Sequence, residues 1–180
     1  MATVDEGTGY EIAFGTFEEA KAMVGQATPV RFGRVEVNAP MIQHFSMMTE
    51  DANASYWDEE YAVATWGALV SPPAMLMVWL MPLEWDPEGS RPEPLLTARV
   101  PLPGTTFVNA STDTEFFAPM RVGDHLNVVE EVVDVSEEKK TALGVGHFVT
   151  TLSTYRRQDG QLVAKNTNVL FRFGAEEEGS

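Results

Sequence analysis

Residues 141–173 read TALGVGHFVTTLSTYRRQDGQLVAKNTNVLFRF, and this stretch decides the fold. Two runs rich in Val, Thr, Phe and Tyr, 141–157 and 161–173, flank the tripeptide QDG at 158–160. β-Branched and aromatic residues favour strands, and a glycine at the end of such a tripeptide suits the left-handed position of a hairpin turn. The stretch therefore predicts a long β-hairpin.

Two further strand-like segments precede the hairpin. Residues 105–117 and 126–135 have the same enrichment in Val, Thr and Phe, and the polar run at 136–140 is typical of a turn. Four such segments in succession predict an antiparallel meander in the second half of the chain.

The first half carries helix-start signals instead. Thr16 and Glu19 form a capping-box pattern, and Asn38 and Asp58 are N-cap residues before helical stretches. Helices that are separated along the chain from an antiparallel sheet indicate the α+β class.

The most apolar segment lies between these halves. We expect a helix from Pro72 to Met81, capped by Ser71 and ended by Pro82, about 15 Å long. A helix without a polar face is normally enclosed by the rest of the fold, so we expect the sheet to wrap around it. Residues 82–103 hold six of the eleven prolines, which predicts a loop rather than regular structure.

Composition narrows the class of protein. The 180 residues carry 12 Lys+Arg against 27 Asp+Glu, a formal charge of −15, which argues against binding to nucleic acid or to an anionic membrane. The absence of cysteine excludes disulfides, thiolate zinc sites and a cysteine nucleophile. No spacing of histidines and acidic residues predicts a metal site.

These features predict one domain with two short ends. We expect a flexible N-terminus at 1–15, a single domain at 16–173 and an acidic tail or linker at 174–180. The N-terminal residues lack the basic and apolar regions of a signal peptide, and the lack of cysteine suits the cytoplasm.

Two segments resemble the MaoC-type hot-dog dehydratases and enoyl-CoA hydratases. The first reads DANASY at 51–56 and continues as WGALVSPPAML at 66–76, and the second reads EFFAPMRVGDHL at 115–126. The resemblance extends over 17–173 and implies a single hot-dog fold, a curved antiparallel sheet wrapped around a shortened central apolar helix. It also implies that two hot-dog domains pair side by side and bind an acyl-CoA at their junction.

The resemblance implies that the catalytic equipment is incomplete. Active members carry the motif Asp-x-Asn-Pro-x-His, and here Asp51 and Asn53 keep their places while Tyr56 replaces the histidine. A tyrosine with a pKa of about 10 is a poor base for activating water. The glycine that donates its N–H to the thioester oxygen corresponds to Pro73, which has no N–H. We therefore expect these four residues to be vestigial, although Asp51 could either cap a turn or assist chemically.

The chain most resembles the non-catalytic subunit of heteromeric enoyl-CoA hydratases for bulky acyl-CoAs, including steroid side-chain thioesters. This resemblance implies a heterodimer or a dimer of heterodimers, with the catalytic Asp and His on the partner. No cofactor is expected, because the substrate itself carries coenzyme A. The basic residues that hold the coenzyme A phosphates would come largely from the partner. We expect Met75, Met77, Trp79 and Met81 to line the space for the acyl tail, unless they are plain core.

Other interpretations stay open. The chain could be a homodimeric hydratase or thioesterase that uses Asp51, or a scaffold subunit that binds acyl-CoA. Among the histidines, we expect His44 to be a partly buried packing residue, His125 a surface residue and His147 a structural residue.

Overall fold

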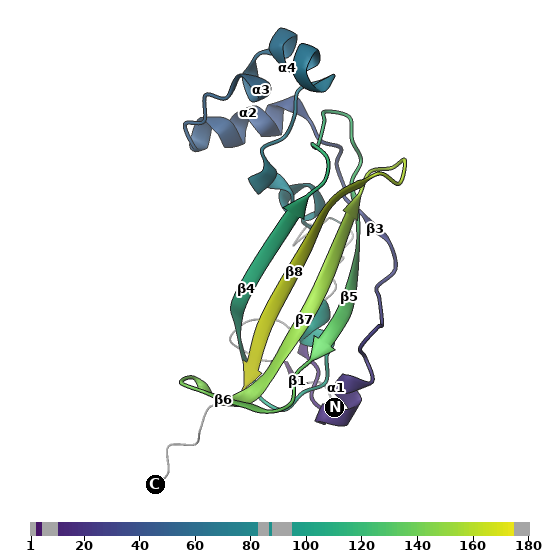
Figure 1. Cartoon of the computed structure of the whole chain (residues 1–180), viewed down its shortest axis with the longest axis vertical. Helices are drawn as coiled ribbons and strands as arrows, with labels where there is room; N and C mark the ends of the chain where they lie inside the picture. Colours follow the sequence, from purple (N-terminus) through teal and green to yellow (C-terminus); the bar gives the residue numbers. More distant parts are fainter. Residues whose placement is uncertain (1–2, 5–10, 83–86, 88–94, 175–180) are drawn as a thin grey trace.

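The computed structural model describes residues 3–4, 11–82, 87 and 95–174, and it consists of a long curved sheet with a cluster of helices at one end (Figure 1). The strands are β1 (Thr3–Val4), β2 (Glu11–Ile12), β3 (Arg31–Phe32), β4 (Thr106–Phe116), β5 (Asn127–Val135), β6 (Lys139–Thr141), β7 (Gly144–Arg156) and β8 (Leu162–Phe173). The helices are α1 (Phe17–Lys21), α2 (Ala39–Met48), α3 (Ala54–Trp57), α4 (Glu59–Trp66) and α5 (Leu96–Arg99), with two 3₁₀ turns, η1 (Pro73–Met75) and η2 (Val78–Leu80).

The main sheet is antiparallel throughout. Its strands follow the order β3-β5-β7-β8-β4, and β6 adds to β7, while β1 and β2 form a separate two-stranded sheet. The four predicted strands are confirmed as β4, β5, β7 and β8, and the α+β class is confirmed with them. The prediction of a simple meander is wrong, because β4 pairs with β8 rather than with β5, the next of the four along the chain.

The hairpin turn has the predicted geometry. Gly160 has a φ of 87°, in the left-handed region that favours glycine. The carboxylate of Asp159 accepts the backbone N–H of Gln161 over 2.9 Å, which closes the turn locally. β7 and β8 leave this turn as the central pair of the sheet.

The helix starts also follow the sequence. Thr16 and Glu19 make the reciprocal bonds of a capping box, and the side chains of Asn38 and Asp58 accept backbone N–H groups at the starts of α2 and α4. Helix α3 was not predicted; it begins after Asn53, whose side chain accepts the N–H of Ser55.

The prediction of a continuous helix from Pro72 to Met81 is wrong. The segment forms η1 and η2, in which the N–H of Leu76 bonds to the carbonyl of Pro73 and the N–H of Leu80 to that of Met77. Both bonds span three residues, as in a 3₁₀ helix, rather than the four of an α-helix.

Contacts from outside the segment explain this difference. The indole of Trp79 donates to the hydroxyl of Ser71 over 2.9 Å, and Nη1 of Arg31 donates to the carbonyl of Leu80 over 2.5 Å. Gly33 lies so close to the Trp79 carbonyl that a Cβ at this position would stand 2.1 Å from the oxygen. These tertiary contacts take up groups that a regular helix would orient differently, and they override the local helical pattern.

The hydrophobic core consists of two clusters. The larger one joins the apolar segment and the helices to one end of the sheet, through Met75, Trp79 and Tyr155, among others. The smaller one packs α1 and α5 against the other end, through Ala20 and Val149, among others. Tyr155 and Val149 are six residues apart on β7, so both clusters lie on the same face of the sheet. We call this face the inner face.

The N-terminal end and the proline-rich stretch contain more regular structure than the sequence predicts. Within 1–15, β2 pairs with β1 and Ile12 is buried, so structure begins before residue 16. Within 82–103, residues 96–99 form α5, while 83–86 and 88–94 lie outside the described residues, as does 175–180 of the expected tail.

In the part of the chain that the structure describes, no helix has the length and apolarity needed to cross a membrane.

Candidate functional site

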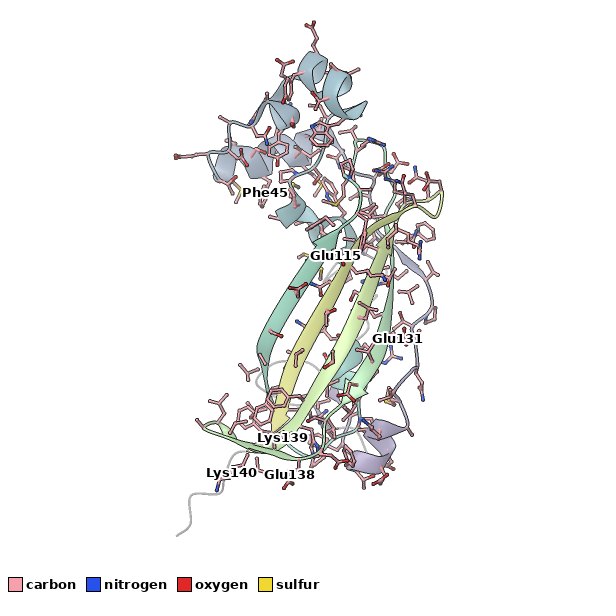
Figure 2. All side chains as sticks on the ribbon, viewed as in Figure 1. Phe45, Glu115, Glu131, Glu138, Lys139 and Lys140 are labelled. Carbon is pink, nitrogen blue, oxygen red and sulfur yellow. The ribbon has the colours of Figure 1, made fainter. Side chains whose placement is uncertain are left out.

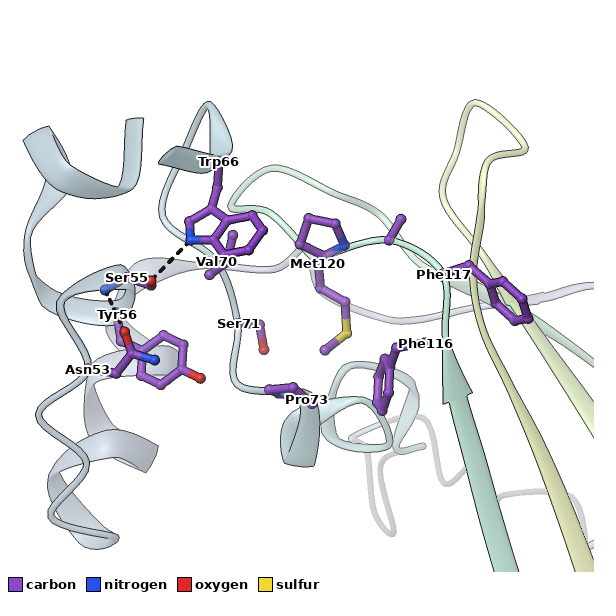
Figure 3. Close-up of a pocket in the computed structure, with 12 residues that line it drawn as sticks. Asn53, Ser55, Tyr56, Trp66, Val70, Ser71, Pro73, Phe116, Phe117 and Met120 are labelled. Carbon is purple, nitrogen blue, oxygen red and sulfur yellow. Dashed lines mark hydrogen bonds between the residues drawn. The ribbon is translucent and has the colours of Figure 1, made fainter. Parts of the chain in front are cut away.

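A pocket of about 340 Å³ lies between the helices and the end of β4 (Figure 3). Its walls come from two parts of the chain, residues between 53 and 73 and the segment 116–120. These are the two segments that carry the family resemblance, so the fold brings together what the sequence separates by more than forty residues.

Backbone bonds join the two walls. The N–H of Ser71 donates to the carbonyl of Met120 over 2.8 Å, and the N–H of Val122 donates to the carbonyl of Leu69 over 2.9 Å. These two bonds form a short antiparallel contact that holds the two walls of the pocket side by side.

A buried ion pair supports the second wall from behind. Nε of Arg157 lies 3.0 Å from Oδ2 of Asp124, and the same oxygen accepts the N–H of Arg121 over 2.6 Å. Nη2 of Arg157 donates to the carbonyl of Pro119. The pair therefore anchors the turn that leads from the pocket to β5.

The pocket is lined by three of the four residues at the family positions, namely Asn53, Tyr56 and Pro73. Figure 3 shows the Tyr56 hydroxyl directed toward Pro73. Burial raises the pKa of Tyr56, and the nearby charge of Asp51 raises this pKa further. The phenol thus stays protonated at neutral pH, and Pro73 offers no N–H to a carbonyl oxygen.

Asp51 lies outside this pocket. Its carboxylate is exposed and accepts the N–H of Asn53 over 3.0 Å, while its carbonyl accepts the indole N–H of Trp57 over 2.8 Å. It lines a second, open pocket of about 480 Å³ beside Met47 and Trp57. The carboxylate makes the contact of a turn-capping residue.

The methionines and the tryptophan of the apolar segment do not line the first pocket. Met75 and Trp79 are each 1% exposed and belong to the larger core cluster. Met77 and Met81 are 58% and 62% exposed, and the sulfur of Met77 accepts the Tyr155 hydroxyl over 3.0 Å. The segment therefore divides into core residues and surface residues.

Pocket residues that the sequence analysis did not single out include Trp66, Phe116 and Met120. All three stand inside the quoted motifs, but only the fold shows that their side chains meet. The indole of Trp66 donates to the Ser55 hydroxyl over 3.1 Å, which fixes one apolar wall.

The three histidines lie apart from the pocket. His44 is exposed, so the expectation of a partly buried side chain is wrong, and His125 is half-buried. His147 is buried, stacks on Phe17 with ring centroids 5.3 Å apart, and places Nδ1 2.9 Å from the carbonyl of Ser136, which is a structural role. Among the described residues, no three His, Cys, Asp or Glu side chains lie close enough to hold a metal ion.

Strand β4 presents a second surface of interest. It pairs with β8 on one side, no described strand pairs with its other side, and nearly all of its eleven residues are exposed. Ala110 falls at a register shift between Asn109 and Ser111 and has no partner on β8.

A curved antiparallel sheet with an apolar segment on its inner face and a pocket beside its edge strand defines a hot-dog domain of the dehydratase type. The family model described as "FAS1-like, dehydratase domain region" matches residues 22–166. The chain belongs to this family, and its fold is the MaoC-like hot-dog fold that the motifs predicted.

Two curated relatives and one solved structure are similar to the chain. A protein of Thermomonospora curvata named "Probable enoyl-CoA hydratase alpha subunit" is 40% identical over 149 residues, which cover 79% of this chain and 47% of that protein. The "3-oxo-4,17-pregnadiene-20-carboxyl-CoA hydratase alpha subunit" of Mycobacterium tuberculosis is 28% identical over 161 residues, which cover 85% of this chain and 51% of that protein.

The solved structure is the ChsH1-ChsH2 complex from Mycobacterium tuberculosis. One of its chains is 28% identical, with a TM-score of 0.71, and the match covers 91% of this chain and 90% of that chain. The present chain spans about half the length of the curated relatives that it matches.

Proposed function

We propose that this chain is the non-catalytic, pocket-forming subunit of a heteromeric 2-enoyl-CoA hydratase that acts on a bulky hydrophobic acyl-CoA. The observation that carries the proposal is the pair Tyr56 and Pro73, which occupy one pocket at the family positions of the water-activating histidine and the N–H donor. The catalytic Asp and His then belong to a partner hot-dog subunit. The names of the relatives, which are alpha subunits, and the two-component title of the solved complex support this assignment.

The chemistry of hydration explains why the pocket alone is insufficient. Adding water to a 2-enoyl thioester needs a base for the water and donors for the thioester oxygen. A protonated phenol cannot accept the proton, and a proline nitrogen cannot donate. With Val70, Phe116 and Met120 in its walls, the pocket is suited to hold an apolar group.

The free edge of β4 is the surface that we assign to the partner. An edge strand exposes unpaired N–H and C=O groups, and proteins usually protect such an edge with prolines, lysines or a covering element. β4 contains no proline and no lysine, and its charges are Asp113 and Glu115. A partner strand along this edge gives a heterodimer, and two such pairs give a dimer of heterodimers.

The distribution of basic residues fits a complex in which the partner subunit binds the coenzyme A phosphates. Residues 35–90, which supply the first pocket wall, contain no lysine or arginine, and Lys139 and Lys140 lie at the end of the sheet opposite to helices α2, α3 and α4 (Figure 2). Coenzyme A phosphates need cations, so the partner supplies most of them in this proposal. No separate cofactor takes part, and the absence of cysteine suits a cytoplasmic enzyme.

The acyl group occupies space on the inner face. Because η1 and η2 are short turns, the segment leaves Met77 and Met81 exposed, and we assign these two flexible side chains to the acyl tail at the junction. Met75 and Trp79 hold the segment in place from the core. The relative that is named for a steroid-carboxyl-CoA supports a steroid side-chain or similarly bulky acyl group.

Co-expression with the product of the neighbouring open reading frame tests the proposal. The purified chain alone should not hydrate 2-enoyl-CoA, and the complex should do so. The Asp51→Asn variant keeps a capping oxygen and should leave the activity of the complex within about twofold of wild type.

Two outcomes would favour the alternatives. Activity of the chain alone that Asp51→Asn abolishes would identify a stand-alone homodimeric hydratase or thioesterase. A complex that binds acyl-CoA but hydrates none would identify a scaffold subunit.

A further inference from the structure

Polar side chains cross the inner face of the sheet between the two core clusters. They form two rows of directly opposed residues on β5, β7, β8 and β4, which we call the polar rows. The first row is Glu130, Ser153, Asn166 and Thr114. The second row is Thr151, Asn168 and Thr112, and on β5 it meets Val132 of the smaller core cluster.

The position of these rows is unusual for a sheet that packs against an apolar segment. Ser153 and Thr151 are each 5% exposed, so their hydroxyl groups are buried on the face that carries the core. Burying a polar group costs free energy unless it is hydrogen-bonded, and the Ser153 hydroxyl donates to the Glu130 carboxylate over 3.5 Å. The neighbouring row on the pocket side contains Tyr155 and Ala164 and is apolar.

The rows open toward the edge strand. Burial decreases from Thr151 and Ser153 on β7, through the half-buried Asn166 on β8, to the exposed Thr112 and Thr114 on β4. A group that enters across β4 therefore meets polar side chains of increasing burial.

The hydrogen bonds within the rows leave donors for a ligand. Nδ2 of Asn166 donates to Oγ1 of Thr114 over 2.7 Å, and Nδ2 of Asn168 donates to Oγ1 of Thr112 over 2.9 Å. A hydroxyl that accepts a bond keeps its own O–H, so both threonines can donate to an incoming oxygen. The single charge in the rows is the carboxylate of Glu130, so a neutral oxygen is favoured over an anion.

The polar rows lie next to the pocket on the same face of β4. Phe116 lines the pocket and lies opposite Ala164, on the same face as Thr114 and Thr112. Two and four residues along a strand correspond to roughly 7 Å and roughly 13 Å. A bulky acyl group that lies along the inner face from the pocket end reaches the rows with its far end, and a short acyl group does not.

We infer that the polar rows bind a neutral carbonyl or hydroxyl oxygen at the far end of the acyl group. Thr112 and Thr114 donate to this oxygen, and Asn166 and Asn168 hold the two hydroxyl groups in place. This inference rests on the proposed function and adds to it the residues that recognise the distal oxygen of the acyl group.

The test compares two substrates in the complex with the catalytic partner. One probe is a 2-enoyl-CoA with a fused-ring acyl group that ends in a ketone, and the other is the same thioester with a methylene in place of the ketone. The double variant Thr112→Val/Thr114→Val keeps side-chain volume and removes both donors. Its kcat/KM for the ketone probe should fall about tenfold, as expected for the loss of neutral hydrogen bonds, while that for the methylene probe stays within about twofold.

Thr167→Val is the matched control. Thr167 lies between Asn166 and Asn168 on β8, so its side chain points to the opposite face. The kcat/KM of this variant should equal that of wild type for both probes. Equal kcat/KM of the wild-type complex for both probes, or an equal loss on both in the double variant, would overturn the inference alone. A wild-type complex that hydrates neither probe would overturn the proposed function, and the inference with it.

Discussion

The guanidinium of Arg157 and the carboxylate of Asp124 form an ion pair whose side chains are 5% and 11% exposed. The distance is 3.0 Å, although the Nε–H is not aligned for a hydrogen bond, so the contact is ionic. The pair holds the turn that carries one wall of the pocket, through the backbone of Arg121 and Pro119. The pocket therefore depends on a buried charge pair outside its own walls.

Removing one member of this pair should destabilise the protein strongly. Arg157→Met leaves the carboxylate of Asp124 buried without a cation, which typically costs about 3–5 kcal/mol of unfolding free energy. Denaturation in urea measures the loss. In the exposed pair of Lys21 and Asp134, Asp134→Asn should cost at most about 1 kcal/mol, and a similar loss in both variants would contradict the argument.

The bond from Trp79 to Ser71 should matter for the apolar segment. Ser71→Ala leaves the buried indole N–H without its acceptor, which should lower the unfolding free energy by about 1–3 kcal/mol. Ser55→Ala, which removes the acceptor of the more exposed Trp66, should cost less. Equal losses of unfolding free energy in the two variants would show that the burial of the indole does not determine the size of the effect.

Alkaline pH should weaken the fold through its buried tyrosines. Burial raises the pKa of Tyr155, and the charge of Glu130 raises it further, while a hydrogen bond to Ser153 lowers it. A pKa above that of the unfolded chain favours the folded state below about pH 10, and this stability is lost as the pH rises through the folded value. Tyr155→Phe should therefore flatten the fall of Tm above about pH 10. An unchanged slope would rule out Tyr155 as a cause.

Assembly should depend on the edge of β4. Ala110→Pro places a proline at the position that has no partner on β8, where it breaks no register pair within the chain but removes one N–H from the edge strand and fixes the backbone φ. Co-purification with the catalytic partner should drop to background. Ala142→Pro, in the exposed turn before β7, should leave assembly intact, and equal recovery from both variants would place the interface elsewhere.

Restoring the histidine should not restore catalysis. Tyr56→His returns an imidazole to the family position, but Pro73 still cannot donate to the thioester oxygen. The purified variant should show no hydration above that of wild type. Turnover by this variant alone would show that the missing N–H is dispensable.

The strands and the helix starts could be predicted because their signals are local. The enrichment in Val, Thr, Phe and Tyr along 141–173 and the caps at Thr16, Asn38 and Asp58 act within a few residues. The path of the apolar segment could not be predicted in the same way. The carbonyl of Leu80 in its second turn bonds to Arg31, forty-nine residues away along the chain.

The same limit applies to the candidate site. The local motifs pointed to Asn53, Tyr56 and Pro73 separately, and only the fold shows that all three line one pocket. The polar rows join residues such as Thr114 and Asn166, which are fifty-two positions apart. The register between strands that are far apart along the chain depends on the whole sheet, so no short sequence pattern predicts it.

The divided core has a consequence for how the molecule holds together. Each apolar cluster holds one end of the sheet, and the strands between them carry the polar rows on the inner face. We expect the two ends to open as separate units of local unfolding that share the same strands. If the acyl group lies across this zone as proposed, it touches both units, and we expect its binding to make them unfold as one.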